Sequence, residues 1–90
     1  MPDKKFSTRF KKDLKRYEHK KEVIKEFNDV LKLLLSKTKL PEKYRDHGLA
    51  GSYVNYRECH IKPDVLLIYK IGERLLYLDR IGSHSELFLN

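Results

Sequence analysis

Cysteine, tryptophan and long hydrophobic segments are scarce or absent in this 90-residue chain. The single cysteine, Cys59, cannot form an intrachain disulfide, so a disulfide-rich secreted scaffold and a cysteine-based zinc site are both excluded. No apolar run approaches the length of about 20 residues that a membrane-spanning helix needs, and the N-terminus (Met-Pro-Asp-Lys-Lys) lacks the apolar core of a signal peptide. We therefore expect a cytoplasmic protein that folds as one domain over residues 1–90.

Positive charge is in excess, and it lies in one half of the chain. Residues 1–40 contain 13 Lys+Arg and 6 Asp+Glu, whereas residues 41–90 contain 7 of each, so the net charge of +7 belongs to the first half. A basic surface attracts polyanions, because each Lys or Arg placed against a phosphate releases counterions. A solvated helical surface that only keeps the protein dissolved is the alternative explanation.

The first half has the periodicity of two helices. Residues 4–7 are predicted as a short strand or an extended lead-in, and Ser7 or Thr8 is suited to cap the helix that follows, because its hydroxyl accepts from a free backbone N–H. An apolar stripe then recurs every three or four residues: Phe10, Leu14 and Tyr17. A longer amphipathic helix follows with the same spacing: Val23, Ile24, Phe27, Val30, Leu31, Leu34 and Leu35. No Gly or Pro marks the connection around His19, so one kinked helix is the alternative.

The second half alternates strand-forming runs with turn residues. Three runs are predicted as strands: Tyr53–Ile61, Val65–Ile71 and Leu75–Ile81. The connections at Pro63-Asp64 and at residues 72–74 are short, which favours antiparallel neighbours. Alternation along the first strand places one set of side chains on a common face: Tyr56, Glu58, His60 and Lys62. The predicted fold class is α+β, with two N-terminal helices packed on a small, mainly antiparallel β-sheet.

Histidines gather around the turns of the second half. Histidine has an unperturbed pKa of about 6.5, so a pair of histidines can act as base and acid near neutral pH. RNA cleavage uses such a pair, because a base takes the ribose 2′-OH proton and an acid protonates the departing 5′-oxygen. The candidate catalytic residues are His47, His60, Asp64 and His84. Three nearby cations are candidates for bracing the phosphate: Arg57, Lys62 and Arg80.

Several of these residues also have a plain structural explanation. A loop histidine is usually a surface residue, and an aspartate after proline is a common turn residue. The two arginines could pair across strands with Glu58 or Asp79. Cys59 is most simply a buried small residue without a local base. The tyrosines of the strands either stack on bases or complete a core: Tyr53, Tyr56, Tyr69 and Tyr77.

A metal site is a second chemical interpretation of the same cluster. Three histidines and an aspartate are an acceptable ligand set for zinc, but they lack the compact spacing of zinc motifs. We therefore expect chemistry without a metal or other cofactor.

Three segments of the chain resemble the YafQ-type toxins, a branch of the RelE/ParE superfamily of toxin–antitoxin modules. The segments are Asp46–Gly51, Tyr56–Tyr69 and Arg80–Phe88, and they carry the ordered motifs D-H-x-L-x-G, H-x-x-P-D and G-S-H-x-x-L-F. The match is close over residues 40–88, whereas the N-terminal half fits in pattern only. Gly48 stands where related toxins often have proline.

The resemblance implies a RelE-like fold and an endoribonuclease that cuts mRNA in the ribosomal A site and inhibits translation. It places the catalytic group of the family on His47, His60, Asp64 and His84, and its C-terminal aromatic, which helps to hold the mRNA, on Phe88. The implied partners are a cognate antitoxin, mRNA, and ribosomal RNA gripped by the basic N-terminal helices, with operator DNA reached only through the antitoxin. A ribonuclease that needs no ribosome and a non-catalytic basic nucleic-acid-binding module are the alternatives.

Overall fold

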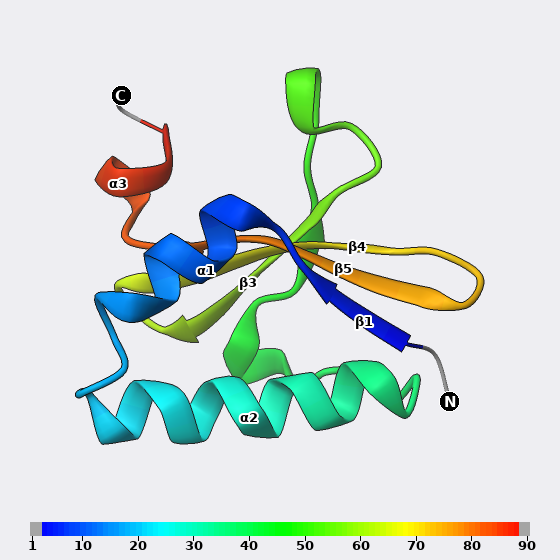
Figure 1. Ribbon diagram of the computed structural model, residues 1–90. Helices are drawn as coiled ribbons and strands as arrows, with labels where there is room; N and C mark the ends of the chain where they lie inside the picture. Colours follow the sequence, from blue (N-terminus) through cyan, green and yellow to red (C-terminus); the bar gives the residue numbers. More distant parts are fainter. Residues whose placement is uncertain (1–2, 89–90) are drawn as a thin grey trace.

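The computed structural model describes residues 3–88, and its elements are drawn in Figure 1. In these residues one sheet is formed in the order β1-β5-β4-β3-β2. Its strands are β1 (Asp3–Phe6), β2 (His47–Gly48), β3 (Arg57–Lys62), β4 (Val65–Ile71) and β5 (Leu75–Gly82). β1 runs parallel to β5, and every other neighbouring pair is antiparallel. The predicted α+β class, with helices on a mainly antiparallel sheet, is confirmed.

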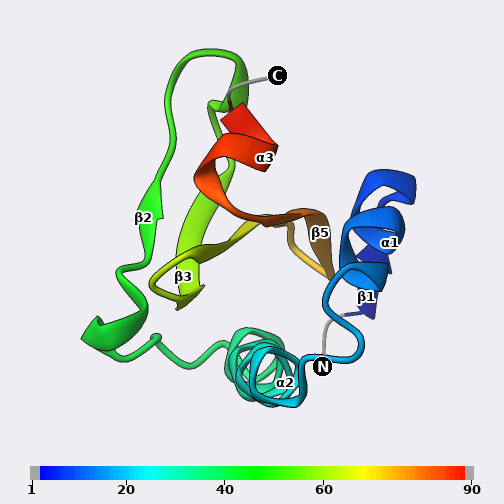
Figure 2. The ribbon, with the colours of Figure 1, turned by 90° about the vertical axis from the view of Figure 1, so that its left-hand side faces the viewer.

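The helices cover different parts of the sheet. They are α1 (Thr8–Lys15), α2 (Lys21–Leu35) and α3 (His84–Phe88), with 3-10 turns at Glu42–Tyr44 and Gly51–Tyr53. Figure 2 shows α2 against one face, α3 over the opposite face, and α1 beside the β1–β5 edge. The predicted N-cap is present, because the Ser7 hydroxyl accepts from the Phe10 N–H at 2.9 Å. No helix within residues 3–88 is long and apolar enough to cross a membrane.

The sheet has an apolar layer on each face. The larger layer lies between the sheet and α2, and it joins fully buried residues of several elements: Phe10, Val30, Cys59, Leu67, Leu78 and Ile81. The smaller layer joins Leu66 and Ile68 of β4 to Leu87 of α3. β4 is therefore buried on both faces, as its unbroken apolar run predicts. The candidate site lies on the face of this smaller layer.

Two local predictions are wrong or incomplete. The strand predicted from Tyr53 begins at Arg57, because Tyr53 ends a 3-10 turn and Asn55 takes a left-handed backbone conformation (φ 75°) that interrupts an extended chain. Helix α3 is not among the predicted elements, although its signal is in the sequence. The Ser83 hydroxyl accepts from the Glu86 N–H (3.2 Å), and the Glu86 carboxylate accepts from the Ser83 N–H (2.8 Å). This S-x-x-E arrangement is a capping box, which starts a helix at His84.

Candidate active site

Glu58 lies between two of the predicted catalytic histidines. β2 pairs with β3 so that His47 stands opposite Glu58, and His60 follows two residues later on the same strand face. The Glu58 Oε1 atom is 3.4 Å from Nε2 of His47 and 3.8 Å from Nε2 of His60. Glu58 is 8% exposed. A nearly buried carboxylate is thereby placed to stabilise positive charge on either imidazole.

The backbone fixes the orientation of His47. Its Nδ1 atom is 2.8 Å from the Arg45 carbonyl oxygen, and a carbonyl can only accept, so Nδ1 carries a proton in this bond. Nε2 is then the atom that faces Glu58. Arg45 itself adopts a left-handed conformation (φ 49°), which turns the chain between the 3-10 turn and β2. The His47 and His60 rings lie 6.5 Å apart between centroids.

Cross-strand register brings the third histidine to the same face of the sheet. His60 is opposite Leu66, which is in turn opposite Gly82. Directly opposite residues share a face, and His84 begins α3 two residues beyond Gly82. Because Leu87 packs against Leu66 and Ile68, α3 lies on the sheet face that carries Glu58 and His60, and His84 is exposed at its first residue.

Phe88 lies beside His84. Their ring centroids are 5.1 Å apart, and Phe88 also contacts the ring of Tyr53 at 6.0 Å. Asp64 is exposed in the turn between β3 and β4, at the strand end beyond His60 and outside the contacts between Glu58 and the histidines. The structure thus brings His47 and His60 together around Glu58 and leaves Asp64 at the rim. His84 and Phe88 lie together on α3, and within residues 3–88 His84 makes no contact with Glu58 or with the other two histidines.

The three predicted phosphate-binding cations each have a carboxylate partner, and the partners of the two arginines differ from those considered from the sequence. Arg57 donates to Asp46, with Nη2 at 3.0 Å from Oδ2, and the buried Tyr69 hydroxyl donates to the same carboxylate. This bond raises the pKa of the Arg57 guanidinium and keeps it charged. Lys62 makes a 3.7 Å ion pair with the exposed Glu22, which is weak and easily exchanged. Neither arginine pairs with Glu58 or Asp79 in residues 3–88.

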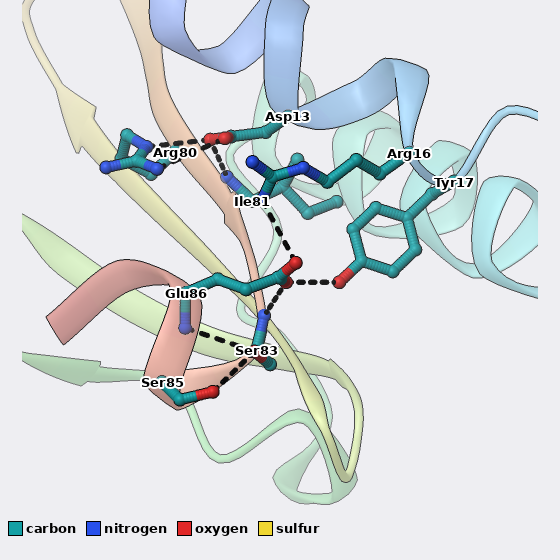
Figure 3. Close-up of polar contacts among 8 residues, drawn as sticks. All are labelled: Asp13, Arg16, Tyr17, Arg80, Ile81, Ser83, Ser85 and Glu86. Atoms are coloured by element: carbon teal, nitrogen blue, oxygen red, sulfur yellow. Dashed lines mark hydrogen bonds and ion pairs between the residues drawn. The ribbon is translucent and has the colours of Figure 1, made fainter. Parts of the chain in front are cut away.

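Arg80 is tied to α1 by a buried carboxylate, as Figure 3 shows. Asp13 accepts from Nε (2.7 Å) and Nη2 (3.1 Å) of Arg80 and from the backbone N–H of Ile81 (3.2 Å). Asp13 is 3% exposed. The contact fixes the end of β5, from which the chain continues to His84.

A second carboxylate holds α3 from the other side of the same junction (Figure 3). Glu86 accepts from the Tyr17 hydroxyl (2.8 Å) and from Nη1 of Arg16 (3.0 Å), in addition to the Ser83 N–H. These donors lower the pKa of the Glu86 carboxyl. The segment after α1 therefore positions the short helix that carries His84, although it contributes no residue to the histidine group.

Two features of the site are missing from the sequence-based set. The first is Glu58, although the alternation of β3 places it on the His60 face. The second is a pocket of about 380 Å³ beside His60 whose lining includes three cations: Lys43, Arg45 and Lys62. Lys43 and Arg45 lie in the 3-10 turn region, where no periodic pattern indicates the direction of a side chain.

Two other kinds of site can be assessed from the same geometry. Cys59 is fully buried, and burial raises the pKa of its thiol, so it is unsuited to act as a nucleophile. Within residues 3–88, no group of three or more His, Cys, Asp or Glu side chains is arranged to hold a metal ion.

Comparison with known proteins gives the family. A family model described as the bacterial toxin YafQ of type II toxin–antitoxin systems matches residues 3–89. The mRNA interferase toxin YafQ of Escherichia coli K12 is 37% identical over 87 residues, covering 96% of this chain and 95% of that protein. The toxin in the solved E. coli DinJ–YafQ complex is 35% identical with a TM-score of 0.87, over 98% of this chain and 99% of that one. A metal-bound toxin from Helicobacter pylori is 43% identical with a TM-score of 0.89, over 98% and 100%. The predicted family is confirmed, and the chain belongs to the YafQ family of bacterial type II toxins.

Proposed function

We propose that this toxin is an mRNA interferase that cleaves mRNA in the ribosomal A site and so inhibits translation. The family supports an endoribonuclease, since the E. coli relative carries that activity in its name. The observation that carries the proposal is the position of Glu58 between His47 and His60 on the sheet face opposite α2. This arrangement supplies groups that take and give protons close to a set of cations.

The reaction needs only proton transfer and charge stabilisation. A base removes the 2′-OH proton of the ribose, and the 2′-oxygen attacks the adjacent phosphorus. The bond from phosphorus to the 5′-oxygen breaks, and an acid protonates that oxygen. The products are a 2′,3′-cyclic phosphate and a 5′-hydroxyl, with no net change in protons and no metal in the steps.

The geometry supports particular roles for the histidines. His60 is the proposed base, because Glu58 can stabilise the imidazolium that forms when it takes the proton. His84, on α3, is the proposed acid, and His47 helps to hold the phosphate. Asp64, at the rim, is the alternative base. Each proton-transfer group is expected to contribute a factor of about 10² to 10⁴ to the rate.

Cations and an aromatic ring complete the proposed site. Asp13 occupies Nε and Nη2 of Arg80, so its remaining nitrogen, Nη1, is the atom available to the phosphate. Lys62 lies on β3 two residues after His60, and Arg57 precedes Glu58 on the same strand with its side chain turned to Asp46. Their ion pairs with carboxylates can be exchanged for a phosphate. Phe88, next to His84, is the proposed ring against which a base of the mRNA packs.

Binding partners are proposed from charge and from the relatives. A cognate antitoxin is expected, since E. coli YafQ is known in complex with DinJ. The basic N-terminal region, with α1 and α2, is the proposed contact with ribosomal RNA, and operator DNA would be reached only through the antitoxin.

The test is primer extension on a defined mRNA with purified protein, in the presence and absence of translating ribosomes. Cuts at codon boundaries only with ribosomes support the A-site proposal, and cuts in both conditions support a ribosome-independent ribonuclease. Salt-sensitive RNA binding without any cut would support a non-catalytic binding module. Activity that is lost with a chelator would contradict the metal-free steps.

Substitutions test the assigned residues in the same assay. His60→Ala and His84→Ala should each lower the cleavage rate by about 100-fold or more, because each removes a proton-transfer group. Glu58→Gln keeps the shape but loses the charge beside His60, and it should slow cleavage as well. His19→Ala is the matched control, because His19 is exposed in the turn after α1, away from the sheet. Wild-type rates in both His60→Ala and His84→Ala would refute the assignment.

A further inference from the structure

A row of aromatic rings lies on the same sheet face as the histidines. Phe88 contacts Tyr53, the Tyr53 and Tyr56 centroids are 5.7 Å apart, and those of Tyr56 and Tyr77 are 6.5 Å apart. The three tyrosines come from the loop before β3 and from β5, and all of them are half-buried. The row thus runs without a break from Phe88 on α3 to Tyr77 near the start of β5.

Strand register places this row next to the candidate site. Tyr77 is opposite Lys70, while Ile68, two residues earlier on β4, is opposite both Glu58 and Arg80. Two residues along a strand span about 7 Å, which is close to the spacing of bases in an extended single strand. The aromatic row therefore stands about one nucleotide beyond Glu58 on a shared surface.

These tyrosines differ from the core tyrosines of the same chain. Tyr17, Tyr44 and Tyr69 are at most 6% exposed, and each hydroxyl donates to a carboxylate. In residues 3–88, the hydroxyls of the row have no such partner. A purely structural tyrosine usually finds a partner for its hydroxyl when it is buried. Partly exposed rings, side by side on one sheet face, are what a base-stacking surface requires.

Charge on the row favours an anionic ligand. Lys70 is exposed, and its Nζ atom lies 5.4 Å from the Tyr56 centroid, so a cation stands beside the stacking surface. The negative charge of Asp79 also acts on Tyr56, and the positive charges of Arg80 and Arg9 partly compensate for it. The combination of rings, a cation and continuity with the histidine group fits single-stranded RNA.

We propose that Tyr56 and Tyr77, with Tyr53 and Lys70, form a stacking surface for bases of single-stranded RNA that flank the cleaved phosphate. This inference rests on the proposed ribonuclease function and extends it to substrate binding. Stacking reads no particular base, so the row contributes affinity and positioning rather than sequence preference.

The test measures binding of a fluorescein-labelled oligoribonucleotide to the full chain carrying His84→Ala, which removes the proposed acid and so limits cutting during the measurement. Tyr56→Leu and Tyr77→Leu should each weaken binding by about 5- to 150-fold, the range expected for one lost base stack. Tyr56→Phe keeps the ring and should bind like the parent. Ile71→Ala is the matched control, because Ile71 follows Lys70 on β4, is 55% exposed and lies outside the row.

A second arm uses the unmutated chain, so it does not depend on whether a variant folds. An oligoribonucleotide with abasic sites flanking the cut position should bind more weakly than the intact RNA by a similar factor. Equal binding of the two RNAs, or parent-like binding by folded Tyr56→Leu and Tyr77→Leu, would overturn the inference. Loss of antitoxin binding alone would assign the row to the antitoxin and would also overturn it. If the unmutated chain cleaves RNA while these tests fail, only this inference is lost. If it never cleaves RNA, the proposed function fails.

Discussion

The buried contact between Asp13 and Arg80 gives the sharpest prediction for stability. The two side chains are 4% and 15% exposed, and their closest atoms are 2.7 Å apart. Asp13 also accepts from the buried Ile81 N–H. In Asp13→Ala the guanidinium and this N–H lose their acceptor while the neighbouring protein still shields them from most solvent. A buried charge without its partner costs far more than an exposed one, because little water can replace the lost carboxylate.

The expected loss follows from this geometry. Breaking a buried ion pair by removing one partner costs about 3–5 kcal/mol. A domain of this size has a total unfolding free energy of roughly 5–13 kcal/mol, so the loss is a large fraction of its stability. The corresponding fall in melting temperature is more than about 10 °C. Because Ile81 precedes the segment that leads to His84, cleavage should fall as well.

The assay is urea unfolding at neutral pH followed by circular dichroism. Asp29→Ala is the matched control, since its ion pair with Lys25 on α2 is long (3.8 Å) and its side chain is 46% exposed. That control should change the unfolding free energy by no more than about 0.5 kcal/mol. Replacing both partners, in Asp13→Ala with Arg80→Met, should recover part of the loss, because no unpaired charge then remains.

Two results would refute this reasoning. The first is an unfolding free energy for Asp13→Ala within about 1 kcal/mol of the parent, which would mean that water already reaches the guanidinium. The second is a double variant, Asp13→Ala with Arg80→Met, that is clearly less stable than Asp13→Ala alone. That result would mean that the unpaired guanidinium is not the cause of the stability lost in Asp13→Ala.

Three further predictions concern titratable groups. The pKa of Glu86 is lowered from 4.5, first by the Ser83 N–H, so its contribution to stability is present above pH 4.5 and is lost as the pH falls through the lower folded-state value. Glu86→Gln should therefore lose less stability than the parent between pH 7 and pH 3 in urea unfolding, and an equal loss would contradict the assignment. Cys59 is fully buried, so an aromatic disulfide reagent should label it only after unfolding, and rapid labelling of the native protein would contradict its burial. Burial and a carboxylate partner raise the pKa of Tyr17 and of Tyr44 to about 12, so the stability that depends on their neutral form is complete below pH 10 and is lost as the pH rises through about 12. Absorbance at alkaline pH should show a late-ionising class of tyrosines, and titration of all tyrosines near pH 10 would refute the proposed partners.

Much of the fold could be predicted because local patterns agree with the tertiary structure. The stripe from Val23 to Leu34 faces the core, and β4 occupies the predicted run Val65–Ile71. The predictions fail where one or two residues decide the path of the chain. Asn55, with its left-handed backbone, delays β3, and periodicity contains no sign of that conformation. Helix α3 is too short to show a repeat, and only its capping box marks it.

The sequence by itself determined the family and the α+β class, and it supplied the candidate histidines. Helix and strand periods and the three motifs are local features, so they can be recognised without coordinates. It also placed Glu58 and His60 on one face. Only the tertiary structure decided that His47 would stand opposite Glu58, that Arg80 would be held by Asp13, and that Tyr56 and Tyr77 would lie half-buried beside the site. The physical reason is distance along the chain. Asp13 and Arg80 are 67 residues apart, and such a pair meets only when strand register and helix packing have fixed both positions.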